Sequence, residues 1–100
     1  MNTDELDDAL NVLACEFDKR PKGAPSFFDL RHSILRSHRE SDVLRIEFDP
    51  ARSAAVEHLV EAERLCCAGI GWDLQQSPAL VLSIRATPAQ LDVFEQMLTA

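Results

Sequence analysis

The chain has 100 residues, of which 46% are hydrophobic and 27% charged, and its formal net charge is −7 at pH 7. A chain of this length can bury one modest core, so we expect a single α+β domain over residues 1–100. The negative charge argues against a nucleic-acid partner, because phosphate-binding proteins normally present a clustered basic face.

The start of the chain is acidic and polar, which does not fit a secretory signal peptide. No apolar run approaches the roughly 18 residues that are needed to span a bilayer. These features predict a cytoplasmic protein with no membrane partner. In that compartment the three cysteines are better interpreted as thiols or metal ligands than as a disulfide framework.

Residues 1–25 are predicted to form an N-terminal helix and a basic loop. Apolar residues at helical spacing place the helix over residues 4–18, and its stripe consists of Leu6, Leu10, Leu13 and Phe17. A short strand over residues 12–17 is the alternative, because an alternating pattern also fits there. Residues 19–25 (KRPKGAP) combine two prolines, a glycine and three positive charges, which is typical of a loop.

Residues 26–100 are predicted to form a core with the element order α-β-α-β-β-α. Ser26 and Asp29 resemble a capping box and predict a second helix that ends near Glu40. The expected apolar face of this helix comprises Phe27, Phe28, Ile34 and Leu35. Its basic residues between Arg31 and Arg39 are interspersed with or flanked by acids, so we interpret them as a solvated face.

The remaining elements carry clearer patterns. Alternation predicts strands over residues 43–48, 70–75 and 80–85, the last two forming an antiparallel hairpin. Asp49-Pro50 starts a third helix that runs to about Ala68, where Gly69 ends it. A capping box over residues 87–90 begins the last helix.

These elements predict a three-stranded, mainly antiparallel sheet in the order 1-3-2, preceded by two helices. A strand-helix-strand crossover followed by a hairpin favours that order, which resembles half of a ferredoxin-like fold. Each strand has one polar face, so we expect helices on one face of the sheet only. Two open sheet edges, together with Leu65 on the polar side of the third helix, predict a homodimer.

The candidate functional residues lie on the third helix. At about 100° per residue, Glu63, Cys66 and Cys67 lie on the apolar stripe that faces the core. A carboxylate there is costly unless it is paired, hydrogen-bonded or protonated. The alternatives are that the cysteines only pack as small hydrophobes, and that the helix tilts so that Glu63 reaches solvent.

Paired thiols beside a carboxylate predict a soft-metal site. Thiolates select ions such as Cu(I), Zn(II), Cd(II), Hg(II) or As(III), and we expect Cys66 and Cys67 as ligands with Cys15 and Glu63 as supplements. Without a C-x-x-C motif, a structural zinc site is not expected. Thiol redox chemistry is the rival interpretation. The negative end of the helix dipole disfavours a reactive thiolate at the cysteine pair, and a vicinal disulfide there would be strained. The three histidines are predicted on exposed helix faces.

The segment Glu63-Arg64-Leu65-Cys66-Cys67, followed by Trp72-Asp73-Leu74 and an apolar strand, resembles a known pattern. It is similar to the E-R-x-C-C core of small bacterial proteins often encoded near MerR-type regulators and heavy-metal resistance determinants. The similarity covers about residues 42–99. Ala68 and Gly69 stand where the family usually has proline and an aromatic residue.

The resemblance implies metal or metalloid handling by association, with a regulator or another metal-handling protein as partner. Together with the paired thiols, it predicts a heavy-metal or metalloid binding protein acting as carrier, buffer or regulator accessory. No catalytic residue is predicted. The alternatives are a non-catalytic dimeric interaction module with structural cysteines, and a thiol redox protein.

Overall fold

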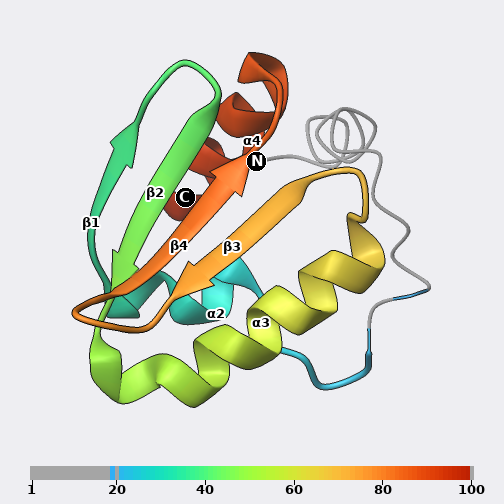
Figure 1. Ribbon diagram of the computed structural model, residues 1–100. Helices are drawn as coiled ribbons and strands as arrows, with labels where there is room; N and C mark the ends of the chain where they lie inside the picture. Colours follow the sequence, from blue (N-terminus) through green and yellow to red (C-terminus); the bar gives the residue numbers. More distant parts are fainter. Residues whose placement is uncertain (1–18, 20, 100) are drawn as a thin grey trace.

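The computed structural model of the protein describes residues 19 and 21–99 (Figure 1). The helix expected over residues 4–18 and the alternative strand over 12–17 therefore lie outside the described residues. The elements, in chain order, are α2 Phe27–Leu30, η2 Arg31–Ser33, β1 Ile34–Arg39, β2 Val43–Phe48, η3 Pro50–Arg52, α3 Ser53–Cys66, β3 Gly71–Gln75, β4 Leu80–Arg85 and α4 Pro88–Thr99.

The sheet has four strands, in the order β1-β2-β4-β3, and every neighbouring pair is antiparallel. The prediction of a three-stranded sheet preceded by two helices is therefore wrong. The predicted neighbours are retained within the larger sheet, because β4 lies between β2 and β3. The additional strand, β1, comes from the segment that was expected to complete the second helix.

That second helix begins as predicted but ends after one turn. Ser26 Oγ accepts from the Asp29 amide, and Asp29 Oδ2 accepts from the Ser26 amide, so both halves of the capping box are present. From Arg36 to Glu40 no apolar residue follows, so a longer helix would have nothing to bury there. Pairing with β2 instead satisfies the backbone, with a register irregularity between Ile34 and Arg36.

Strand β2 and helix α3 follow the pattern that the sequence indicates. Leu44, Ile46 and Phe48 are buried, whereas the intervening Arg45 and Glu47 are partly exposed. Asp49 Oδ1 accepts from the Ala51 amide at 3.0 Å, which caps the 3-10 turn η3 ahead of α3.

The predicted hairpin and last helix are also present. Strands β3 and β4 pair from Gly71 opposite Arg85 to Gln75 opposite Val81. Thr87 Oγ1 accepts from the Gln90 amide, and Gln90 Oε1 accepts from the Thr87 amide, which is the expected capping box.

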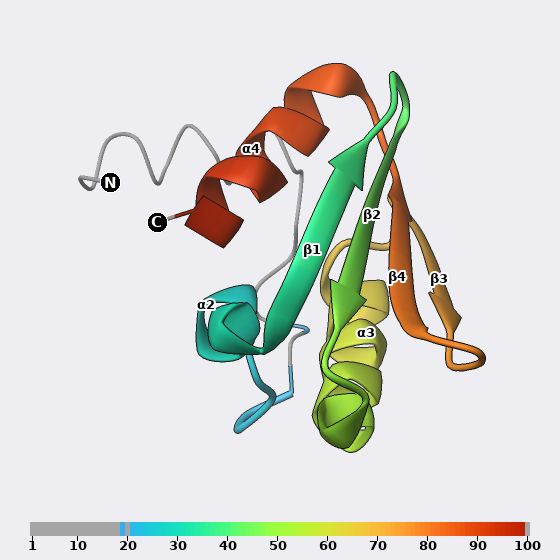
Figure 2. The same cartoon turned by 90° about the vertical axis from the view of Figure 1, so that its left-hand side faces the viewer.

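One core joins all three described helices to one face of the sheet. Figure 2 shows α2 and α4 on the same side of the sheet, toward opposite ends of β1. The buried core residues come from the three helices and from β2, β3 and β4, but not from β1. The largest fully buried side chains include Phe48, Leu59, Leu82, Phe94 and Leu30. The opposite face is polar and carries, for example, the Arg36–Glu47 ion pair at 3.3 Å between β1 and β2.

Arg39 connects the end of β1 to α4. Its guanidinium donates to Glu95 Oε1 at 2.6 Å, to the Pro88 carbonyl at 3.0 Å and to Asp92. Hydrogen bonds first to Asp92 and then to Glu95 raise the pKa of Arg39 above its ordinary value. The contact fixes α4 against a strand that supplies few residues to the core.

Within the described part of the chain, every helix is too short or too polar to cross a membrane.

Two leucines test the reassignment of residues 34–39 to a strand. Leu44 is 1% exposed on β2, whereas Leu35 is 55% exposed on β1 although the helical pattern placed it in the core. We expect Leu44→Ala to lower the free energy of unfolding by about 2–5 kcal/mol and Leu35→Ala to change it by less than about 0.5 kcal/mol. Urea denaturation measures both, and an equal loss in the two variants would contradict the assignment.

Candidate functional site

The last turn of α3 places the predicted site residues in the protein interior. Glu63 is 7% exposed, and Cys66 and Cys67 are each 2% exposed. The prediction that the Glu63 side chain faces inward is confirmed, and the alternative of a helix tilted to expose it is not observed. Glu63 is the only charged residue in the described part of the chain that is buried.

The helix ends at these residues through bonds to the Cys67 backbone. The Cys67 amide donates to the Glu63 carbonyl at 2.6 Å. The Cys67 carbonyl accepts from the Ile70 amide at 3.1 Å and from the Trp72 indole Nε1 at 3.2 Å. The end of α3 is thereby attached to the start of β3, and one of the terminal carbonyls that lack a helical partner receives two donors.

Trp72 also organises the apolar surroundings of this helix end. Its ring stacks on Phe27 with centroids 6.2 Å apart and meets the Phe94 ring edge-on at 5.5 Å. Phe27 and Phe94 are themselves 5.6 Å apart. This aromatic trio joins α2, β3 and α4, so Trp72 anchors the core at this helix end.

Cys67 and Glu63 are in direct contact. Cys67 Sγ lies 3.5 Å from Glu63 Oε2. Cys67 is disulfide-bonded in the structure, whereas Cys66 is a buried thiol. A disulfide sulfur carries no hydrogen, so the contact becomes a hydrogen bond only when Cys67 is a thiol.

This disulfide differs from the expectation that all three cysteines are thiols or ligands. Because Cys66 keeps its thiol, Cys67 does not form the strained vicinal bond with its neighbour. The chain has three cysteines, so Cys15 is the only other one. Cys15, the predicted third metal ligand, lies outside the described residues.

Over residues 19 and 21–99, no group of three or more histidine, cysteine, aspartate or glutamate side chains is arranged to hold a metal ion. His32, His38 and His58 are exposed, as the sequence predicts, but His38 lies on strand β1 and not on a helix. The described residues that remain relevant to the predicted site are therefore Glu63, Cys66 and Cys67.

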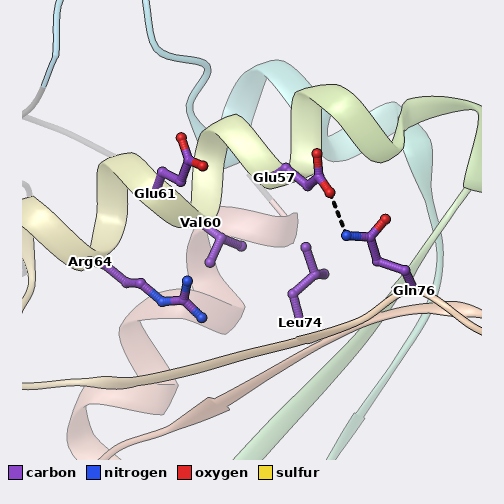
Figure 3. A pocket seen from close by; sticks show the side chains of 6 residues that line it. All are labelled: Glu57, Val60, Glu61, Arg64, Leu74 and Gln76. Atoms are coloured by element: carbon purple, nitrogen blue, oxygen red, sulfur yellow. Dashed lines mark hydrogen bonds between the residues drawn. The ribbon is translucent and has the colours of Figure 1, made fainter.

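A second feature, which sequence reasoning missed, lies on the other side of α3. A groove of about 290 Å³ lies between α3 and β3, and Figure 3 shows the side chains that line it. Arg64 Nη2 crosses from the helix to donate to the Trp72 carbonyl at 3.0 Å, and Gln76 Nε2 donates to Glu57 Oε1. The lining residues are Glu57, Val60, Glu61, Arg64, Leu74 and Gln76. Leu74 and Gln76 come from β3 and the turn after it, so spacing along α3 alone does not reveal the groove.

Comparison with protein-family models, curated proteins and solved structures shows no match to this chain. The similarity to E-R-x-C-C proteins therefore remains a prediction from the sequence.

The burial of Cys66 makes its alkylation a test of the site geometry. We expect iodoacetamide to label Cys66 at least roughly a hundredfold more slowly in the native protein than in urea, because labelling requires local opening of the helix end. Mass spectrometry under non-reducing conditions follows the reaction, with Cys66→Ser as the blank. Equal rates in buffer and in urea would show that the thiol is accessible.

Proposed function

We propose that the reduced protein binds a soft metal or metalloid ion through Cys66 and Cys67, with Cys15 and Glu63 as supplementary ligands. The observation that carries the proposal is the burial of two cysteines and one carboxylate on a single helical turn. Soft ions such as Hg(II), Cu(I), Cd(II), Zn(II) or As(III) prefer thiolates. The protein would act as a carrier, a buffer or an accessory to a regulator.

Reduction is a precondition for this function. A sulfur in a disulfide offers no thiolate, and the thiolate is the metal ligand. Cys67 would therefore become a ligand only after its disulfide opens. The nearby Glu63 carboxylate, 3.5 Å from Cys67 Sγ, could then supply an oxygen ligand or accept the thiol proton.

A third thiol would complete the coordination. Side chains of adjacent helical residues diverge by about 100°, so Cys66 and Cys67 alone do not close around one ion. Cys15 is the only other thiol that the chain offers. A three-thiolate site would suit As(III) or Hg(II), whereas the two thiols alone would leave an open site from which an ion is readily passed on.

The proposal also includes the compartment, the oligomeric state and the partner of the protein. A reducing cytoplasm would keep the thiols competent, and a homodimer would cover one open sheet edge. Leu35 on edge strand β1 is 55% exposed, which suits that contact. A regulator or another metal-handling protein would be the recipient of the ion, as the E-R-x-C-C similarity implies.

Calorimetric titration tests the metal site. Protein reduced with a phosphine is titrated with Hg(II), Cu(I), Cd(II), Zn(II) and As(III). We expect at least one of these ions to bind more than a hundredfold more tightly than it binds Cys66→Ser/Cys67→Ser, because serine removes both soft ligands. The matched control is His32→Asn/His38→Asn, which removes two exposed ligands and should leave affinity unchanged. Equal binding by the double serine variant would refute the proposal.

The disulfide at Cys67 favours a second function, thiol redox chemistry. We propose that Cys67 and a second cysteine, Cys15 within one chain, exchange with an external disulfide of the glutathione class. Two protein thiols form one S–S bond, and the external disulfide takes up the two electrons and two protons to become two thiols.

Equilibration in glutathione buffers of varied ratio tests the second function. We expect Cys66→Ser to form the disulfide as the parent does, and Cys15→Ser and Cys67→Ser to form no intramolecular disulfide. Alkylation after acid quenching and mass spectrometry count the remaining thiols. A bond that persists in Cys15→Ser would assign the pairing to Cys66 and Cys67 instead.

A further inference from the structure

The groove between α3 and β3 lies beside the outer edge of β3. Among the described strands, β3 is an end strand of the sheet and pairs only with β4, on its inner edge. The Trp72 carbonyl accepts a hydrogen bond from Arg64, a side chain of α3, so this carbonyl points away from β4. In an antiparallel ladder the N–H and C=O of one residue point the same way, and residues two apart repeat the direction. The backbone of Leu74 therefore also points outward.

The surface beside this edge has both apolar and acidic parts. Val60 from α3 and the partly buried Leu74 from β3 form the apolar floor. Glu57 and Glu61 are exposed on α3 and are one turn apart, so a single cationic side chain can reach both. Figure 3 shows Arg64 reaching from α3 toward β3 and Leu74 pointing from β3 toward the helix.

The charge of the groove selects the partner. Its lining contains two carboxylates and one guanidinium, which gives a net charge of −1, and the guanidinium is already bound to the Trp72 carbonyl. The whole chain carries −7.

We propose that β3 and the groove bind an extended segment of a partner protein that carries a basic and an apolar residue two positions apart, because residues two apart share one face of a strand. The segment pairs with the backbone of Leu74 as an additional strand. Its basic side chain reaches Glu57 and Glu61, and its apolar side chain packs on Val60 and Leu74. The mode is strand addition at a sheet edge, in which backbone bonds supply affinity and side-chain pockets supply specificity. It is independent of the cysteine chemistry, because Glu63, Cys66 and Cys67 are buried in the core.

Fluorescence anisotropy with a labelled peptide of two Lys-Thr-Val-Thr repeats, which places lysine and valine on the same face of a strand, tests the proposal. We expect the peptide to bind about tenfold more weakly to Glu57→Gln/Glu61→Gln than to the parent protein, because two surface charge interactions are lost. Added salt should also weaken binding to the parent protein. The control variant Asp42→Asn/Glu47→Gln removes the same charge from outside the groove and should retain most of the affinity. A peptide of two Glu-Thr-Val-Thr repeats should bind at least tenfold more weakly.

Backbone pairing is tested separately with the Lys-Thr-Val-Thr peptide N-methylated at alternate residues along one edge. We expect at least a tenfold loss when the methylated edge faces β3, because two hydrogen bonds are removed at an otherwise unchanged charge. Equal binding of the methylated and parent peptides, or of the Glu57→Gln/Glu61→Gln variant and the parent, would overturn the proposal. Sedimentation as a dimer that the peptide dissociates would instead assign the edge to a second copy of this chain.

Discussion

The carbonyl of Cys67 determines how the helical and sheet parts of this protein meet. It accepts one hydrogen bond from the Ile70 amide, which shapes the turn, and one from the Trp72 indole, which belongs to the next strand. The indole ring in turn contacts Phe27 and Phe94 from two other helices. A change in the backbone at Cys67 would therefore disturb the cysteine pair, the start of β3 and the aromatic packing together.

The two faces of helix α3 carry residues of different chemistry. The inward face ends in Glu63, Cys66 and Cys67, where burial shields the sulfur atoms from solvent. The outward face carries Glu57, Glu61 and Arg64 beside the exposed edge of the sheet. The first face suits a small soft ion or a disulfide exchange, and the second suits a chain segment.

Sequence patterns predicted those elements that have one clear period. Alternation in β2, β3 and β4 and the capping residues of α2, η3 and α4 were identified because each follows from local chemistry. Strand β1 was missed because its residues bury little and the register irregularity after Ile34 breaks the alternation. Phe28 and Leu35 fit a helical face in sequence, although both are more than half exposed in the structure.

The inward position of Glu63, Cys66 and Cys67 was predictable from helical spacing alone, but their chemical state was not. Which cysteine is oxidised depends on tertiary contacts that spacing does not encode. X-ray absorption spectroscopy of the reduced, ion-loaded protein tests the thiol site most directly. We expect a first shell dominated by sulfur, at about 2.3 Å for Zn(II), that is lost in Cys66→Ser/Cys67→Ser. A shell of nitrogen and oxygen only would contradict the thiol site.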